Sequence, residues 1–475
     1  PMTPQRPTLA TKFFYGIGSI AYGVKDNGFS FFLLLYYNQV LGLPERLVGI
    51  GIMVTLLLDA ISDPVIGYLS DHLESRWGRR HPFMYASVLP VMVAYYFLWN
   101  PPVQLEGWAL FAYFLCIAVT VRTVITLYEI PSSSLVAELT DDYDERTQIL
   151  GLRYFFGWWG GLGMALIAYG FFLQPDATHA VGVLNRDGYR AYGAFAAAVM
   201  GATILLSALG THGHIPHLRR RPVLVRSLRQ TRDELRVTFA NPSFRAILGG
   251  GLFAAMASGL MASLSIYFNT YFWELDSTEI LKIVLGNFVS AAVALLAAPR
   301  LGRRFGKKPA ALAVAGAAII VGPLPVVARL LGLFPGNDSA LLLPLLFAFN
   351  ATSVALIITF SILVASMIAD IVEDSEVTTG RRSEGVFFAA NSFVQKSVSG
   401  TGVFLSTLLL HLIGFPIDAQ PGEVAPDVVQ RLGLVFIPLV GVLYLVALLF
   451  LSRYRISRAG HTTNVQRLST APSSG

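Results

Sequence analysis

The sequence has little charge and almost no cysteine. Of its 475 residues, 13% are charged, whereas soluble proteins carry about 25%. The single cysteine, Cys116, excludes an intramolecular disulfide and a cysteine-based metal framework, and we expect it to be a packed small side chain. No nucleotide-binding loop, metal-ligand spacing or hydrolytic nucleophile is recognisable, so we predict that the chain is not an enzyme and needs no cofactor.

Apolar sequence is what the chain has in abundance, at 54% hydrophobic residues. Stretches of about 20 apolar residues, which are long enough to cross a bilayer as helices, recur throughout. They predict an all-α membrane protein. The twelve predicted spans are residues 13–41, 47–71, 83–99, 107–137, 149–173, 189–210, 243–273, 279–299, 309–331, 340–371, 385–413 and 428–452.

The longest polar break divides these spans into two groups of six. It predicts a first bundle at 1–210, a cytoplasmic linker at 211–242, a second bundle at 243–453 and a flexible cytoplasmic tail at 454–475. The linker is rich in arginine. Its segment 225–239 is interpreted either as an amphipathic helix on the membrane surface or as a solvated connection.

Basic residues cluster on alternate loops, which by the positive-inside rule places both termini and the linker in the cytoplasm. The net charge of +6 is explained by these loops, without a nucleic-acid partner. The motif 76–82 follows the second span, and a similar motif at 304–309 follows the eighth. This repeat predicts two related halves, the construction of the major facilitator fold. One chain contains both halves, so a monomer suffices.

Two acidic residues lie near the middle of the second span. Asp59 and Asp63 are four residues apart and therefore share one helix face. A carboxylate at the bilayer centre costs about 2.5–3.5 kcal/mol, so such residues are functional by default. With Ser62 they offer oxygen ligands to a hard cation such as sodium, whereas a proton needs only one carboxylate. The alternative is that the aspartates pair with arginines of neighbouring helices.

The fourth and fifth spans carry further polar side chains. Thr126 shares a helix face with Arg122 and with Glu129, and Arg153 at the start of the fifth span is expected to neutralise Glu129. The glycine-rich run 157–163 follows no strand and is interpreted as close helix packing, not as a phosphate-binding loop.

The first and eleventh spans also contain polar residues. Lys25 and Asp26 are adjacent and are expected to point to different faces, with an interfacial, snorkelling lysine as the alternative. Asn391, Gln395 and Lys396 are predicted to hydrogen-bond a polar substrate from the opposite half. For Asn391 and Gln395, hydrogen bonding between helices is an equally good interpretation.

These motifs resemble a known family. Asp59-Ala60-Ile61-Ser62-Asp63-Pro64-Val65-Ile66-Gly67 and the loop Ser75-Arg76-Trp77-Gly78-Arg79-Arg80-His81-Pro82 resemble the melibiose-permease-like glycoside–pentoside–hexuronide:cation symporters of the major facilitator superfamily. The resemblance implies a coupling-cation site formed by Asp59, Ser62, Asp63 and Thr126. It implies a substrate cavity lined by Lys25, Asp26, Glu129, Arg153 and Lys396.

Four positions depart from the family's pattern. Ser62 stands in place of asparagine, Glu129 in place of aspartate, and Ser133 in place of a sugar-stacking tryptophan. Arg122 replaces glycine and is predicted to modify the cation site, because a guanidinium there could pair with an aspartate and displace sodium. The related lysophosphatidylcholine symporters share the motif, so a lysolipid or other amphiphile is the alternative substrate.

The resulting prediction is a secondary symporter that couples a sugar, glycoside or uronide to sodium or a proton by alternating access in a bacterial-type cytoplasmic (inner) membrane. A non-transporting membrane sensor is a third, weaker hypothesis. Cytoplasmic loops are predicted to gate the cycle through ion pairs with Glu138, Asp142, Glu373 or Glu376. The gating residues are Asp71, Arg76, Arg79, Arg80, Arg303 and Arg304.

Overall fold

A computed structural model describes residues 7–140, 143–177, 179–215, 240–379, 400–417 and 419–455. The regular secondary structure of these residues is helical, and none of them forms a strand. The helices of the first half are α1 (Leu9–Ile17), α2 (Ser19–Asn27), α3 (Leu33–Leu35), α4 (Glu45–His72), α5 (His81–Trp99), α6 (Gly107–Leu139), α7 (Tyr143–Ile167) and α8 (Arg186–His212). Those of the second half are α10 (Pro242–Tyr267), α11 (Ser277–Phe305), α12 (Lys307–Val321), α13 (Leu324–Leu330), α14 (Leu342–Thr379), Gly400–Ile413 and α16 (Pro426–Ser452).

Ten helices in the described part of the chain are long and apolar enough to cross a membrane, and they correspond to ten of the twelve predicted spans. The first predicted span is a series of short helices, α1, α2 and α3, with π-helical turns at Gly28–Phe32 and Tyr36–Val40. The eleventh is described only from Gly400 to Ile413. The all-helical membrane fold is confirmed, and the count of twelve stays a prediction.

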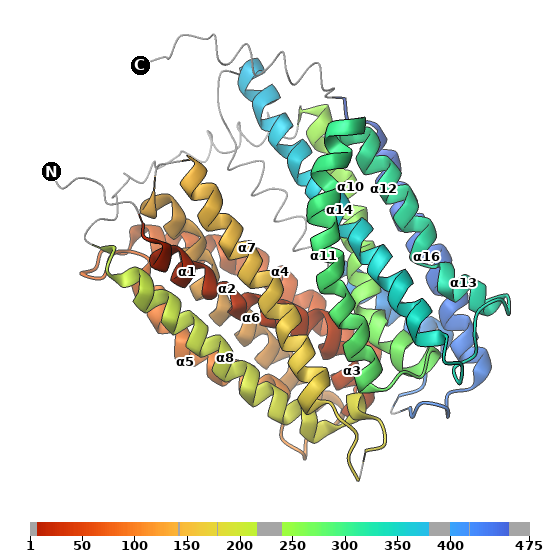
Figure 1. Cartoon of the computed structure of the whole chain (residues 1–475). Coiled ribbons are helices and arrows are strands. Elements are labelled where there is room, and N and C mark those ends of the chain that lie inside the picture. The colour runs from red at the N-terminus through yellow and green to blue at the C-terminus, as the bar shows by residue number, and fades with distance from the viewer. Residues whose placement is uncertain are drawn as a thin grey trace. The chain divides into compact units, whose positions relative to one another are not determined.

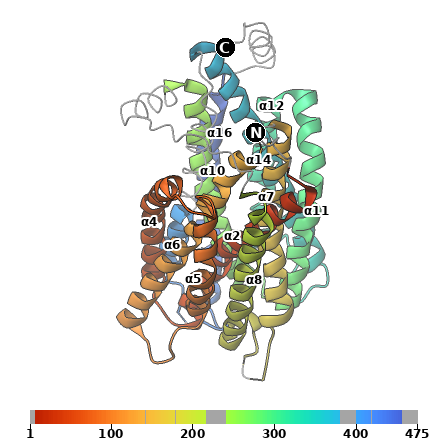
Figure 2. The ribbon, with the colours of Figure 1, turned by 90° about the vertical axis from the view of Figure 1, so that its left-hand side faces the viewer.

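The contacts divide the chain into two compact units. Unit 1 contains residues 1–224, 262–281 and 404–424, and unit 2 contains the remainder. In unit 1, α2 packs on α7, α4 on α6, and α5 on both α6 and α8; α5 and α8 run side by side in Figures 1 and 2. In unit 2, α12 packs on α14 and α16. The predicted boundaries at 210 and 243 remain a sequence-based division.

Close approach of α2 and α7 depends on glycine. A Cβ atom at Gly23 would lie 1.9 Å from the carbonyl oxygen of Gly157, and one at Gly160 would lie 2.9 Å from Cα of Ile20. The interpretation of run 157–163 as helix packing is therefore confirmed. Small residues allow helix backbones to approach closely in membranes, and here Tyr22 of α2 contacts Arg153 of α7.

Cys116 differs from the expectation of a packed side chain, because it is exposed on α6. An apolar run in a membrane helix has an outward face as well as a core face, and sequence alone did not distinguish them.

The linker segment 225–239 and the tail beyond residue 455 lie outside the described residues, so their predicted structures stay predictions.

Candidate functional site

The two aspartates of α4 face α6. Asp59 receives a hydrogen bond from Nη1 of Arg122, and Oδ1 of Asp63 lies 3.1 Å from the hydroxyl of Thr126. The four-residue spacing is the same on both helices, so one turn of α4 is matched by one turn of α6. The structure thus brings together three of the four predicted cation ligands and the arginine predicted to modify the site.

The guanidinium of Arg122 is held from two directions. Its Cζ lies 4.8 Å from the ring centre of Phe29, in addition to the ion pair with Asp59. Phe29 belongs to the π-helical turn Gly28–Phe32, and such turns are frequent at functional sites. Ser62, the fourth predicted ligand, donates to the carbonyl of Asp59 at 3.3 Å within its own helix. The aspartate–arginine pair that was the predicted alternative is formed by Asp59 and Arg122, and cation binding by these side chains stays a prediction.

Lys25 of α2 connects two carboxylates. Its Nζ lies 2.8 Å from Oδ1 of Asp26 and 3.8 Å from Oε2 of Glu129. The Lys25 side chain is 6% exposed and that of Asp26 is 58% exposed. The two residues therefore differ in exposure, but the expectation that they point apart is wrong for the Lys25 head group, because its long flexible stem reaches back to its neighbour.

Arg153 of α7 is buried and holds α6. Its Nη1 donates to the hydroxyl of Ser132 at 3.0 Å, and its Nη2 donates to the main-chain carbonyl of Glu129 at 3.3 Å. Its Cζ lies 5.1 Å from the ring centre of Tyr22 on α2. The two hydrogen bonds go to a serine and to the backbone of Glu129, and neutralisation of the Glu129 carboxylate by Arg153 stays a prediction.

These seven charged side chains form what we call the inner polar cluster. It contains four carboxylates and three cations, contributed by α2, α4, α6 and α7 of unit 1. Such a set of oxygen and nitrogen groups, most of them buried or partly buried, can bind a small cation and a polyhydroxylated solute. The cluster consists of Lys25, Asp26, Asp59, Asp63, Arg122, Glu129 and Arg153.

Two arginines of the predicted gating loop in the first half, between α4 and α5, form ion pairs with one glutamate of α6. Nε of Arg79 and Nε of Arg80 lie 2.8 Å and 2.9 Å from Oε1 of Glu138, and Nη1 of Arg80 donates to Ser70 at 2.6 Å. These bonds join the α4–α5 loop to the end of α6. Arg76 instead lies over the ring of Trp77, with Cζ 5.2 Å from its centre.

The matching loop of the second half has different partners. Lys307 pairs with Asp370, and Lys308 donates to the main-chain carbonyl of Tyr454 at 2.7 Å. Arg303 is exposed, and Cζ of Arg304 lies 5.3 Å from the ring centre of Phe305.

Several predicted residues lie outside the described part of the structure. The substrate candidates Asn391, Gln395 and Lys396 are among them, as is Asp142. The side chains of Asp71, Glu373 and Glu376 are also outside it, so their gating roles stay predictions.

Sequence reasoning missed a neutral polar group at the end of the first span. Tyr267 donates to Oδ1 of Asn38 at 2.8 Å, and Gln39 bonds to the main chain of Pro416 at 3.0 Å and Ala419 at 2.9 Å, all within unit 1. Glu45 is 2.8 Å from the His411 ring nitrogen. The sequence signal for this group was the pair of adjacent amides, Asn38 and Gln39, in an otherwise apolar span. Their partners are hundreds of residues away in the sequence and could not be predicted from it.

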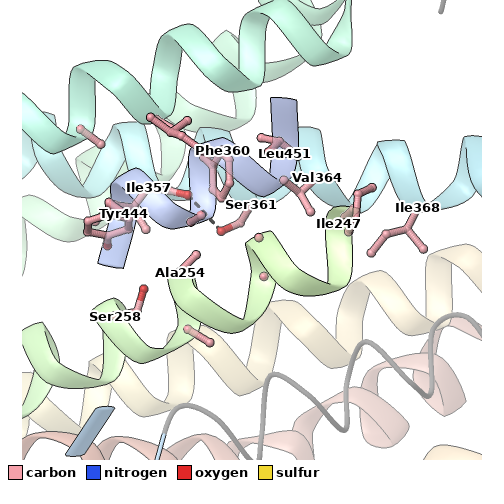
Figure 3. Close-up of a pocket in the computed structure, with 18 residues that line it drawn as sticks. Ile247, Ala254, Ser258, Ile357, Phe360, Ser361, Val364, Ile368, Tyr444 and Leu451 are labelled. Carbon is pink, nitrogen blue, oxygen red and sulfur yellow. Dashed lines mark hydrogen bonds between the residues drawn. The ribbon is translucent and has the colours of Figure 1, made fainter. Parts of the chain in front are cut away.

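Unit 2 contains a pocket of about 310 Å³ bordered by α10, α12, α14 and α16. Figure 3 shows its lining, in which Phe360, Val364 and Leu451 are typical and hydroxyl groups come from Ser258, Ser361 and Tyr444. No charged side chain is among the described residues that line it.

Comparison with known proteins identifies relatives along the whole chain. An uncharacterized symporter of Synechocystis is 27% identical over 98% of both chains. A putative glycoside/cation symporter of Escherichia coli is 23% identical over 95% of this chain and 93% of its own. The sodium-dependent lysophosphatidylcholine symporter 1 of Gallus gallus is 25% identical over 94% of this chain and 86% of its own.

Solved structures with the same fold are also transporters. The crystal structure of a D-xylose–proton symporter matches with a TM-score of 0.63 and 14% identity, covering 95% of this chain and 98% of that one. A bacterial homologue of the human lysosomal transporter Spinster matches with a TM-score of 0.63 and 15% identity, covering 98% of each chain. These likenesses show that the chain has the fold of these transporters.

Residues 14–458 match the family described as MFS/sugar transport protein, and the chain belongs to that family. It is therefore a multi-pass membrane transporter and not an enzyme. The family resemblance predicted from the second-span motif is confirmed, since its relatives include both a glycoside/cation symporter and lysophosphatidylcholine symporters.

Proposed function

We propose that this protein is a cation-coupled symporter that carries a sugar, glycoside or uronide through the cytoplasmic (inner) membrane of a bacterium by alternating access. Its termini and central linker face the cytoplasm, as the basic loops predict. Relatives named as glycoside/cation symporter and isoprimeverose transporter support the solute class.

The inner polar cluster is the observation that carries this proposal. Its four carboxylates exceed its three cations by one, so one bound monovalent cation makes the cluster neutral. Desolvating an unbalanced charge is costly in a membrane. A cation bound at Asp59, Ser62, Asp63 and Thr126 therefore lowers the cost of closing the cavity, which is how binding of the ion is coupled to movement of the solute.

The solute-binding part is the side of the cluster nearest α2. Asp26 offers an exposed carboxylate, and Lys25 and Glu129 lie within 3.8 Å of one another beside it. Carboxylates accept and ammonium groups donate, so together they match the alternating hydroxyl groups of a sugar. Arg153, the other cation on this side, fixes α6 through Ser132 and the main chain of Glu129.

Transport into proteoliposomes tests the proposal. A panel of glycosides, pentosides and uronates is offered under an inward sodium or proton gradient, first to the wild-type protein. Asp63→Asn is expected to abolish gradient-driven accumulation while solute exchange without a gradient persists. Asp187→Asn is the matched control, since Asp187 is an exposed acid paired with Arg190 at 3.3 Å. Undiminished accumulation by Asp63→Asn would contradict the coupling role.

A lysolipid or similar amphiphile is the second candidate, favoured by the apolar pocket of unit 2 (Figure 3). Its volume of about 310 Å³ and lack of charge among the described lining residues suit an acyl chain. Ala254→Phe narrows the pocket. It is expected to reduce transport of a lysolipid, whereas sugar transport through the inner polar cluster stays at the wild-type rate.

A further inference from the structure

We propose that Arg122 is a resident cation that takes the place of a sodium ion at Asp59, so that the carrier binds no sodium and is coupled to protons. This inference deepens the proposed function and rests on its assignment of Asp59 and Asp63 to the cation site. It concerns the identity of the ion and not that of the solute.

The geometry places the guanidinium inside the site. Arg122 and Thr126 are one turn apart on α6, and they contact Asp59 and Asp63, which are one turn apart on α4. The Arg122 side chain is 11% exposed and that of Asp59 is 18% exposed. The positive charge therefore reaches the carboxylate pair from the same helix that supplies the threonine ligand.

The aromatic ring of Phe29 lies beside the guanidinium of Arg122 and favours an organic cation at this position. A guanidinium stacks favourably on an aromatic face, and the distance of 4.8 Å from Cζ to the ring centre is within the range of that interaction. A ring face offers no oxygen ligand. On this side of Asp59 the site is therefore built for a planar, weakly hydrated cation and not for a sodium ion.

One oxygen atom expected to bind sodium, Oδ2 of Asp59, is occupied by the guanidinium of Arg122. The hydroxyls of Ser62 and Thr126 donate to the carbonyl of Asp59 and to Asp63 and keep their lone pairs, so the arginine is the group of the chain that competes with sodium. Sodium needs several oxygen ligands at once, whereas a proton needs one carboxylate oxygen. The arrangement is thus compatible with a proton without rearrangement of the arginine.

The charge balance is compatible with a resident guanidinium and one transported monovalent cation. An arginine stays protonated throughout, so Arg122 compensates Asp59 in every state of the transport cycle and cannot leave with the solute. The inner polar cluster then lacks one positive charge. Without the guanidinium it would lack two, and two monovalent ions would be needed in place of one.

Sodium binding to purified protein tests the inference without knowledge of the solute. Thermal unfolding is recorded in sodium chloride and in choline chloride of equal concentration, and binding of radioactive ²²Na⁺ is measured in parallel. The wild type and Arg122→Lys are expected to show no sodium-specific rise in Tm and no ²²Na⁺ binding. Arg122→Gly opens the site, and it is expected to gain both.

Two variants show that any gained sodium is bound at this site. Arg122→Gly/Asp63→Asn is expected to lose the gained response. Arg190→Gln removes an arginine from an exposed ion pair and is expected to behave like the wild type.

Specific binding of ²²Na⁺ by the wild type overturns the inference, and this measurement does not depend on any variant folding. Failure of Arg122→Gly and of Arg122→Gln to gain sodium binding, when both unfold cooperatively, also overturns it, because the arginine then excludes nothing. The proposed function fails by a different result, namely that no sugar, glycoside or uronide accumulates under either gradient.

Discussion

The helices around the inner polar cluster and those around the pocket of unit 2 fill their interiors in opposite ways. The cluster holds seven charged side chains from α2, α4, α6 and α7, joined by ion pairs and hydrogen bonds. The described lining of the pocket contributes only hydroxyl groups as polar side chains, and it is otherwise apolar (Figure 3). Among the described residues, the inner polar cluster is thus built of charged groups and the pocket of Figure 3 is not.

The two basic loops show the same contrast on a smaller scale. In the first half, Arg79 and Arg80 share the carboxylate of Glu138, which is 6% exposed. In the second half, Lys307 pairs with Asp370 and is 33% exposed, while Lys308 binds a main-chain carbonyl. Similar sequence motifs are therefore embedded in the first half by a buried ion-pair network and in the second half by more solvated contacts.

The largest effect on stability is expected from breaking the ion pair between Asp59 and Arg122. Asp59→Asn leaves the guanidinium of Arg122 without its carboxylate. Removing one partner of a fully buried ion pair costs about 3–5 kcal/mol, and the lower end of that range is expected here because the two side chains are 11% and 18% exposed. The expected result is a marked fall in Tm in detergent. Asp59→Asn/Arg122→Gln removes both charges and is expected to recover most of the loss. Equal Tm values for the single and double variants would show that the pair is not a coupled unit.

Breaking the ion pairs of the two basic loops is expected to have an intermediate effect on stability. Glu138→Gln removes the carboxylate shared by two arginines, and a loss of about 3 kcal/mol is expected because Arg80 and Glu138 are buried. Asp370→Asn is the matched change in unit 2, and about 1 kcal/mol or less is expected because Lys307 is more exposed. Thermal unfolding of both variants measures the difference. Similar losses would remove the contrast between the loops.

Periodicity explains how much of this arrangement was predictable. Helix geometry alone places Asp59 beside Asp63 on one face, and Arg122 beside Thr126 on another. Insertion cost then argues that these faces meet away from lipid. Sequence could not decide whether the arginine or a bound ion compensates the aspartates, because that depends on how α4 and α6 are aligned along their axes.

Long-range and irregular features were beyond sequence reasoning. Phe29 contacts Arg122 from a π-helical turn, which shifts the face of a helix without a sequence signature. The bond between Tyr267 and Asn38 joins residues 229 positions apart. No local spacing encodes such a pair. The fold class, in contrast, follows from length and hydropathy of the spans, which are local properties.

The smallest effect on stability is expected from a serine in the pocket. It sharpens the comparison because the same change can be made at Ser132, which contacts Arg153 of the cluster. The Ser361 hydroxyl donates only to the carbonyl of Ile357 in its own helix, at 3.0 Å among the described contacts. Ser361→Ala is expected to change stability by about 0.5 kcal/mol or less.

Ser132→Ala removes the hydroxyl that accepts from buried Arg153 at 3.0 Å. A buried donor without a partner costs about 1–3 kcal/mol, so Ser132→Ala is expected to lower Tm clearly more than Ser361→Ala. Each change deletes one hydroxyl oxygen from within a long helix. The difference between the two Tm shifts therefore reports the different contacts of the two serines, since the substitution is the same. Equal Tm shifts would mean that the hydrogen bond from Arg153 to Ser132 adds no stability. The surroundings of the cluster and of the pocket would then differ in composition but not in what a lost hydroxyl costs.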